Sequence, residues 1–242
     1  MGAPQVVAPL SLAERAQALL QRTSYRRADT DEEREAIFRL RYEAYLREGA
    51  IKPSFGRSFS DRYDDLDNGW NVGLHVDGRL VSAMRIHVGT QDVPEMVATD
   101  VFGEFVRPEL EAGKILIDPT RFVVDPQMAR VYPELPYLTV RVGHMAAEHF
   151  AADTVLATVR AEHQAFYKRV FGHAVVCPPR EYPTLIKPLS LMMLDYPAER
   201  ERILRRYPFF ASSLAERTAI YGEAVPERRN LVPLRRAEPL VS

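Results

Sequence analysis

The sequence predicts an α/β domain with a mixed central sheet of about six or seven strands and helices on its faces. The first observation is the order of patterns, because strand-like apolar runs alternate with segments whose apolar residues recur at helical spacing. The second is the pair Asp77-Gly78 between two apolar runs, which is a strong signal for a β-hairpin. The third is the length, because 242 residues can bury a full core as one large domain.

The predicted elements follow one another in an order that builds such a sheet. Helical spacing occurs in four segments, residues 11–21, 30–49, 133–150 and 161–170. Strand-like runs occupy seven segments, residues 25–28, 70–76, 80–88, 114–124, 154–159, 174–176 and 189–194. Residues 50–68 are polar and rich in aspartate, which predicts a loop. A loop of this length inside a compact domain is often functional.

The composition excludes several classes of protein. Lys+Arg total 32 and Asp+Glu total 33, a formal charge of -1, whereas a general nucleic-acid binder is strongly basic. The single cysteine, Cys177, rules out an internal disulfide and a cysteine-cluster metal site. The histidines show no metal-ligand spacing either, so we expect no metal. No apolar run reaches a membrane-spanning length, and residues 1–20 lack a secretory signal pattern, so we expect a cytoplasmic protein.

Two arginines stand where the apolar pattern predicts buried side chains. Arg41 lies in the apolar stripe of the second predicted helix, one turn before Tyr45. Arg85 lies in the middle of the third predicted strand, whose two faces are both apolar, as in a strand covered on both sides. A buried guanidinium without a partner costs several kcal/mol, so each arginine requires a carboxylate.

Acidic residues that can serve as those partners lie on the long loop between the two elements. Asp61 and Asp64 stand there, and we expect them to pair with Arg41 and Arg85. Two blander interpretations stay open. One is a purely structural ion pair or a solvated acidic loop, and the other is an arginine whose stem packs while its head reaches water.

A third anomaly interrupts the strand predicted over residues 114–124. Pro119 cannot donate a ladder hydrogen bond, so the strand must bulge or part from its neighbour there. A bulge frees a backbone N–H group and redirects side chains. We therefore expect Asp118 and Arg121 to project near an opening, and a salt-bridged edge strand is the alternative.

An ordered set of short motifs resembles the acyl-homoserine lactone synthases and the related N-acyl amino acid synthases, both of the GNAT (N-acetyltransferase) superfamily. The resemblance runs from Tyr25 to about Leu194. Its first half consists of Arg41-x-x-x-Tyr45, Asp61-x-x-Asp64, Met84-Arg85-Ile86 and Asp118-x-x-Arg121-Phe122. The later half resembles the N-acyl amino acid synthases more closely, through Arg160, His163, Phe166, Tyr167 and Gly172, and through residues 180–183 and 188–195.

The resemblance implies a GNAT-like sheet, mostly antiparallel, with a splay between the fourth and fifth strands. Residues 1–196, with the N-terminal helix over 11–21, would form the acyltransferase domain. Residues 197–242 would form a basic helical extension and tail. These last residues hold nine Arg and six acidic residues, a net charge of +3, which could steer docking of an acidic carrier protein. A solvated basic helix is the alternative.

The resemblance also bears on the acyl donor. Ordinary GNAT enzymes hold the diphosphate of acetyl-CoA with a glycine-containing loop after the bulged strand, and residues 125–130 contain no glycine. We therefore expect the acyl group to arrive on the phosphopantetheine arm of acyl carrier protein, with no tightly bound cofactor. An amino-acid acceptor is the second expected partner, and the fatty product could bring a peripheral membrane contact.

The implied reaction is attack of an amine on an acyl thioester, and the motifs supply a residue for each step. Asp118 is the first choice for the base that takes the amine proton, and a water chain is the alternative. A backbone amide near Phe122 or Val123 would bind the oxyanion. By superfamily analogy, Tyr167 would protonate the leaving thiolate.

The acceptor would bring its own carboxylate, which Arg85 or Arg121 could clamp in bidentate fashion. The acceptor pocket and its loop would be organised by Arg41, Tyr45, Asp61 and Asp64. His163 shares a helix face with Tyr167 and either contacts substrate or is a structural group. We expect the acyl chain to occupy an apolar channel lined by residues such as Met145, Phe150 and Leu156.

Three functions remain in competition at this point. The leading one is an N-acyl amino acid synthase that uses acyl–acyl carrier protein, with a role in bacterial signalling. The second is an acyl-homoserine lactone synthase that takes S-adenosylmethionine. The third is a non-catalytic module that holds acylated carrier protein or a lipid.

Overall fold

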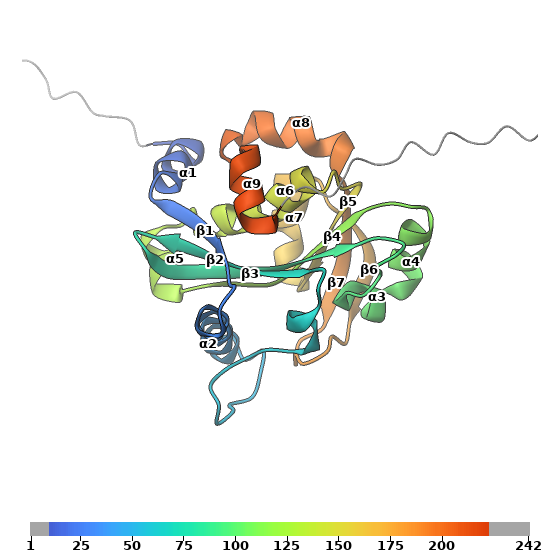
Figure 1. The fold of residues 1–242 in the computed structure, drawn as a ribbon, viewed down its shortest axis with the longest axis horizontal. Coiled ribbons are helices and arrows are strands. Elements are labelled where there is room, and N and C mark those ends of the chain that lie inside the picture. The colour runs from blue at the N-terminus through green and yellow to red at the C-terminus, as the bar shows by residue number, and fades with distance from the viewer. Residues whose placement is uncertain (1–9, 223–242) are drawn as a thin grey trace, which may run out of the picture.

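The structure is a computed structural model that describes residues 10–222, and these residues fold around one seven-stranded sheet (Figure 1). The strand order is β1-β2-β3-β4-β5-β7-β6. The strands are β1 (Thr23–Arg27), β2 (Gly69–Val76), β3 (Arg79–Gly89), β4 (Leu116–Val124), β5 (Thr154–Val159), β6 (Ala174–Arg180) and β7 (Leu189–Asp195). Every neighbouring pair is antiparallel except β4 and β5, which run parallel. The predicted GNAT-like, mostly antiparallel sheet is confirmed.

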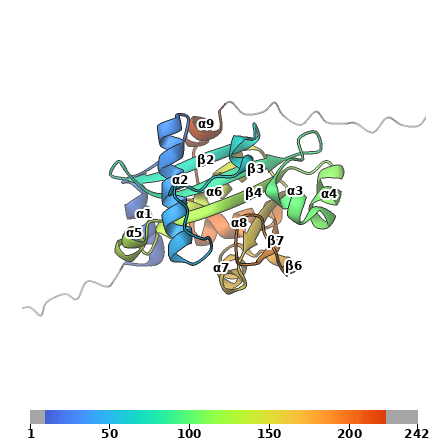
Figure 2. The same ribbon diagram turned by 90° about the horizontal axis from the view of Figure 1, so that it is seen from below.

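Helices cover both faces of this sheet. The α-helices are α1 (Leu12–Leu20), α2 (Asp31–Arg47), α3 (Val97–Val101), α4 (Gly103–Glu111), α5 (Pro126–Val131), α6 (Leu135–His149), α7 (Gln164–Phe171), α8 (Tyr196–Arg206) and α9 (Leu214–Tyr221). Short 3-10 turns are η1 (Arg62–Asp65), η2 (Ala161–His163) and η3 (Pro208–Phe210). Helix α2 crosses one face of β2, β3 and β4, while α6 packs on the other face (Figures 1 and 2).

Local sequence signals explain where several elements begin and turn. The Thr30 hydroxyl accepts from the Glu33 N–H, and the Glu33 carboxylate accepts from the Thr30 N–H, a capping box that starts α2. Asp77 and Gly78 have φ angles of 49° and 82°, which suits the tight turn between β2 and β3. The hairpin and the helix start are therefore where the sequence predicts them.

The sheet splays open between β4 and β5. Only Leu116–Thr154 and Ile117–Val155 pair across the two strands, after which the strands diverge. The pairing stops just before Pro119, which has no N–H group to donate to a neighbour. The predicted splay is confirmed, and its cause lies in the proline that the sequence places there.

Three helices are absent from the sequence-based prediction. α3 and α4 lie between β3 and β4 and bury their own apolar cluster, which includes Phe102 and Val106, against β4, β5 and β7. α5 follows β4 directly, with Pro126 in its first turn. α3 and α5, with five and six residues, are too short to show helical periodicity, and α4 contains Pro108, which is unfavourable inside a helix.

The C-terminal segment packs on the domain as far as the structure describes it. Phe209, Phe210 and Tyr221 belong to the same buried core as α6. Arg141 of α6 is fully buried, donates to the carbonyls of Phe209 and Ala211, and pairs with Glu216 at 3.0 Å. Within the segment expected as a C-terminal extension, residues 197–222 contain nearly all of α8 together with η3 and α9, which pack on the domain through a few buried side chains and are otherwise largely exposed, and residues 223–242 lie outside the described residues. No helix within residues 10–222 is long and apolar enough to cross a membrane.

Candidate active site

A β-bulge marks the point where β4 leaves its neighbour. Thr120 pairs with Arg85 and Val123 pairs with Ala83, so Arg121 and Phe122 together face the single residue between them on β3. Arg121 has a φ of 55°, in the left-handed region that few side chains adopt. Two residues opposite one redirect the side chains and turn backbone amides out of the ladder.

The splay holds a cavity of about 640 Å³. Its walls come from the end of α2, the bulged half of β4, the end of β5, α7 and the segment that leads into β7. Predicted site residues in the lining are Tyr45, Arg121, Phe122, Val123, His163 and Tyr167. The prediction from the proline and the bulge, that β4 borders an opening, is confirmed.

Behind the cavity wall, three arginines and two aspartates form a buried ion-pair network. Asp64 pairs with Arg41 at 2.7 Å and with Arg85 at 3.0 Å. Asp61 pairs with Arg85 at 2.6 Å and also with Arg121, whose Nε donates to it at 3.2 Å. The predicted pairing of the semi-buried arginines with these two aspartates is confirmed.

The network positions its aspartates through the 3-10 turn η1. The Asp61 carboxylate accepts from the N–H of Tyr63, and the Asp64 carboxylate accepts from the N–H of Asp61. The Asp-x-x-Asp spacing therefore folds into one turn with both carboxylates on the same side. This turn docks on β3, where His87 meets the carbonyl of Tyr63 at 2.8 Å.

Partner charges outweigh burial in setting the state of the two aspartates. Burial alone would raise the pKa of Asp61, but Arg121 and Arg85 lower it to about 2. Burial would also raise the pKa of Asp64, and Arg41 and Arg85 lower it. Both carboxylates are therefore ionised at neutral pH and hold the arginines in place.

The network carries one more positive than negative charge. Arg121 Nη1 and Arg85 Nη2 are buried and have no hydrogen-bond partner among the residues that the structure describes. Arg85 lies wholly behind the wall, whereas Arg121 lines the cavity. The Arg121 guanidinium sits between the rings of Phe59, at 4.9 Å, Tyr45 and Tyr182. A buried, unbalanced cation in a cavity wall attracts a small anion.

Asp118 lies apart from the cavity, on the side of α3. Its side chain is fully buried, and Oδ2 accepts from the Ala98 N–H at 3.3 Å, while Oδ1 has no hydrogen-bond partner in the described part of the chain. Burial raises the pKa of Asp118 to about 6. The expectation that the bulge turns Asp118 toward the opening is not met, because the bulge begins after Thr120 and Asp118 still follows the regular register opposite His87.

Two of the three residues expected in the acyl channel, Met145 and Phe150, lie away from the cavity. Met145 and Phe150 belong to the core on the far face of the sheet, so neither lines the cavity. Leu156 lines a small chamber of about 30 Å³ that shares Pro119 and Tyr167 with the main cavity. This chamber lies between β4, β5, α6 and α7 and is about the size of one water molecule, so it is too small for an acyl chain as it stands.

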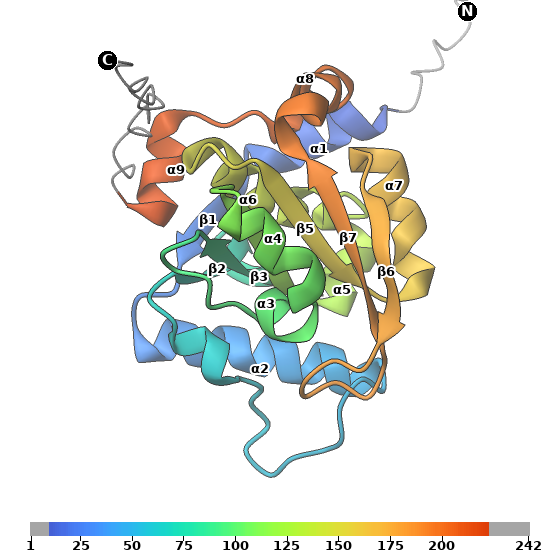
Figure 3. The same ribbon diagram turned by 90° about the vertical axis from the view of Figure 1, so that its right-hand side faces the viewer.

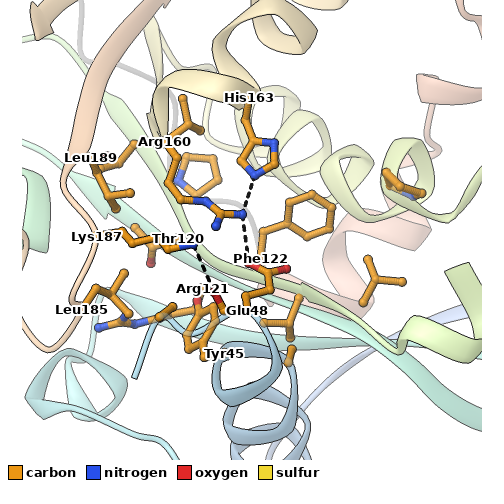
Figure 4. A pocket seen from close by; sticks show the side chains of 18 of the residues that line it. Tyr45, Glu48, Thr120, Arg121, Phe122, Arg160, His163, Leu185, Lys187 and Leu189 are labelled. Atoms are coloured by element: carbon orange, nitrogen blue, oxygen red, sulfur yellow. Dashed lines mark hydrogen bonds and ion pairs between the residues drawn. The ribbon is translucent and has the colours of Figure 1, made fainter. Parts of the chain in front are cut away.

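Tyr167 and His163 reach the cavity from the helical segment after β5. Tyr167 is partly buried, lines both the cavity and the small chamber, and desolvation raises the pKa of its hydroxyl. His163 meets the Arg160 guanidinium through Nε2 at 2.7 Å, so this ring nitrogen is an acceptor (Figure 4). Because desolvation raises its pKa, the Tyr167 hydroxyl stays protonated at neutral pH.

Charged residues at the cavity mouth were not assigned a role from the sequence. Arg160 pairs with Glu48 at 2.9 Å, and Lys187 Nζ donates to the Glu48 carbonyl at 3.1 Å (Figure 4). Arg47 lines the same mouth. Only the tertiary structure joins these residues, because they come from α2, the turn after β5 and the segment before β7. Arg160 belongs to the motif that resembles the N-acyl amino acid synthases, whereas the charges of Arg47, Glu48 and Lys187 carry no sequence signal.

Comparison with protein families adds an independent line of support. Residues 36–195, more than half of the chain, match the model described as N-acyl amino acid synthase FeeM. The chain belongs to the FeeM family of N-acyl amino acid synthases. The matched range contains the complete arginine–aspartate network, the bulge and the cavity mouth. Family membership makes the chain an N-acyltransferase.

Solved structures share the fold at low sequence identity. FeeM from uncultured soil microbes is 18% identical, with a TM-score of 0.63, and the match covers 77% of this chain and 98% of that chain. The acyl-homoserine lactone synthase LasI is 14% identical, with a TM-score of 0.55, and the match covers 86% and 98%. The CoA-dependent acyl-homoserine lactone synthase BjaI is 15% identical, with a TM-score of 0.54 and coverages of 77% and 89%. No protein in a search of curated sequences matched significantly.

Proposed function

We propose that the chain transfers a fatty acyl group from acyl carrier protein to the amine of an amino acid, giving an N-acyl amino acid. One observation carries the proposal. Arg121, buried and with one guanidinium nitrogen unpartnered among the described residues, lines a largely apolar cavity beside a bulged strand. A fatty thioester and a small carboxylate-bearing nucleophile are the two substrates that such a cavity suits. Membership of the FeeM family supports the same reaction class.

Arg121 is the residue that binds the acceptor carboxylate. Asp61 holds its Nε and Nη2 side, which leaves Nη1 directed away from the network. Arg85 contributes through the network rather than by contact, because it is fully buried and does not line the cavity. Arg41, Asp61 and Asp64 fix Arg121 and the loop, and Tyr45 forms the adjacent wall.

The bulge supplies the group that stabilises the reaction intermediate. Attack of the neutral amine on the thioester carbon gives a tetrahedral oxyanion, which needs preformed N–H donors. The amides of Phe122 and Val123 lie at the bulge in the cavity wall and serve as those donors. As the oxyanion re-forms the carbonyl and the carbon–sulfur bond breaks, the sulfur takes the electron pair and Tyr167 donates a proton to it, and water returns the proton released by the amine to Tyr167.

The amine proton leaves through water in the cavity. Asp118 does not touch the cavity, so it does not accept this proton directly. We assign Asp118 a positioning role, since it holds the α3 backbone at Ala98 beneath the bulged strand. His163, whose Nε2 accepts from Arg160, lies in the cavity wall where it orders that water.

The start of α5 supports acyl carrier protein rather than CoA as donor. The Asp125 carboxylate already accepts from the N–H groups of Gln127 and Met128, at 2.8 and 3.3 Å. Asp125 also pairs with Arg79 at 2.8 Å, so the carboxylate is held in place and occupies N–H groups that a CoA diphosphate would otherwise use. Arg160 and Lys187 at the mouth instead suit the single phosphate of a phosphopantetheine arm.

The proposed reaction is tested by product analysis with purified components. The protein is incubated with a long-chain acyl donor and an amino-acid panel, and products are identified by mass spectrometry. We expect N-acyl amino acids from acyl–acyl carrier protein, at rates well above those from the matching acyl-CoA. Acyl-homoserine lactones formed with S-adenosylmethionine, or equal rates from the two donors, would contradict the proposal.

The role of Arg121 is tested by the conservative change Arg121→Lys. Lysine keeps the charge beside Asp61 but lacks the forked donors, so we expect kcat/KM for the amino acid to fall roughly 10- to 100-fold. The same amino acid as its methyl ester has no carboxylate, and wild type and variant should use it equally poorly. Arg39→Lys on the exposed face of α2 is the control. An unchanged KM for the free amino acid would refute the assignment.

A further inference from the structure

Two loops lie side by side next to the cavity mouth. One is the segment over residues 51–60, between α2 and η1, and the other is the segment over residues 184–187, before β7 (Figure 3). The Ile186 N–H donates to the Ala50 carbonyl at 2.9 Å, and both segments line one shallow groove. These residues, 51–60 and 184–187, are here named the double-loop face.

The double-loop face exposes large apolar side chains at its tips. Phe55 is 107% exposed and makes no ring contact with any residue that the structure describes, and Ile186 is 59% exposed. An aromatic ring that is fully exposed to water at a loop tip contributes no apolar burial to the stability of the fold. A pair of such side chains on adjoining loops marks a surface that meets an apolar phase.

The two segments themselves carry cations and no acidic residue, and the acidic residues to which they donate hydrogen bonds, Glu35 and Glu48, belong to the face and end of α2. Residues 49–60 contain Lys52 and Arg57 and no acidic residue, and Lys187 follows Ile186 directly. Neither Lys52 nor Arg57 forms an ion pair with another residue of the described ranges. Free cations behind exposed apolar tips match the layering of an anionic lipid surface, with headgroups outside and hydrocarbon inside.

The face adjoins the site where a fatty product would form, so this step rests on the proposed function. Leu185 lines both the groove of the double-loop face and the main cavity, and Lys187 stands at the cavity mouth. A product with a long acyl chain and a carboxylate is an amphiphile that partitions into a bilayer. A mouth that lies against the membrane releases it there without exposing the chain to water.

We propose that the double-loop face docks the protein on an anionic membrane surface, with Phe55 and Ile186 inserted at the headgroup boundary. An acidic carrier protein would also meet the cations. It would not require two apolar side chains exposed beyond them, whereas a bilayer provides the hydrocarbon for both. The membrane is therefore the occupant that the apolar tips and the charges favour together.

The test uses the full chain and lipid vesicles in a co-sedimentation assay. We expect the protein to sediment with vesicles of phosphatidylcholine mixed with phosphatidylglycerol, and much less with phosphatidylcholine alone. The double variant F55S/I186S should lose about tenfold or more in partitioning. Lys52→Gln and Arg57→Gln should each lose roughly fivefold at low salt and reduce the preference for the anionic vesicles.

Matched controls separate this surface from apolar exposure in general. Val131 and Leu214 are 63% and 60% exposed but lie on α5 and α9, so V131S/L214S should bind vesicles as wild type does. F55S/I186S should retain wild-type turnover of a soluble donor, which shows that it folds. Equal vesicle binding by F55S/I186S and wild type overturns the proposal. The proposal is also overturned if the wild type does not bind vesicles and F55S/I186S loses affinity for acyl carrier protein. That result would assign the double-loop face to the carrier protein. Vesicle binding without any acyl transfer would support the membrane-docking role of the double-loop face and contradict the proposed function.

Discussion

Carboxylates are buried at two places beside the central sheet, and their pKa values shift in opposite directions. Asp61 and Asp64 lie behind the cavity wall among three arginines, and the pKa of Asp61 is lowered to about 2. Asp118 lies under α3 with one backbone N–H as its hydrogen-bond partner, and burial raises its pKa to about 6. Burial alone therefore does not decide the charge of a carboxylate, and the partners on the neighbouring strand and loop do.

The difference also separates the two regions by task. The arginine–aspartate network holds a surplus cation at the cavity, which requires permanently ionised aspartates. Asp118 contributes no permanent charge near pH 6, and it belongs to the packing of α3 against β4. Both regions contact strands β3 and β4, so the effect of a substitution in one region can be compared with the effect of a substitution in the other.

Arg85→Ala should have the largest effect of the three substitutions. It removes a cationic partner from both Asp61 and Asp64, so their surroundings become more like those of Asp118, which has no cationic partner within residues 10–222. Asp61 and Asp64 both lose a partner while remaining buried. We expect the free energy of unfolding in urea to fall by about 3–5 kcal/mol. Arg39→Ala removes an ion pair with Glu35 on the solvent-exposed face of α2. It should lower the free energy of unfolding by less than about 0.5 kcal/mol. Similar losses for both variants would contradict a network held by buried charge.

Asp118→Asn tests the unpaired side of the comparison through its pH dependence. A carboxyl whose folded pKa is raised contributes stability below its unfolded pKa of 3.8 and loses it as pH rises through about 6. The stability of the variant relative to wild type should therefore increase by roughly 2.4 kcal/mol between pH 4 and pH 7. Denaturant titrations of both proteins across this range measure the difference, and a flat difference would refute the raised pKa.

Asp61→Asn gives the smaller effect, and it has the opposite sign. A carboxyl whose folded pKa is lowered contributes stability above its unfolded pKa of 3.8 and loses it as pH falls toward 2. The wild type should lose roughly 2 kcal/mol of this contribution between pH 4 and pH 2, which the variant does not have. The gap between the two proteins should thus narrow in acid. A gap that widens as pH falls would show that the arginines do not control Asp61.

Much of the site was readable from residues that violate a local pattern. Arg41 and Arg85 interrupt apolar faces, so their need for carboxylates followed from the cost of a buried charge, and the pairing with Asp61 and Asp64 is present. Pro119 interrupts a strand, so an opening beside it followed from its missing N–H group, and the splay is present.

The direction of individual side chains was not readable in the same way. Asp118 was expected in the opening, yet one residue of strand register decides on which side of the sheet it lies. Met145 and Phe150 are apolar and helical in pattern, and the pattern does not say which face of the sheet their helix covers. The charged cavity mouth joins Glu48, Arg160 and Lys187 from three distant segments.

By itself, the sequence determined which residues must be paired and where the sheet must open, because a buried charge and a missing donor carry a free-energy cost wherever the chain places them. Only the tertiary structure decided which side of β4 faces the cavity and which distant charges meet at its mouth. Those outcomes depend on strand register and on the crossing of helices over the sheet, which no local pattern encodes.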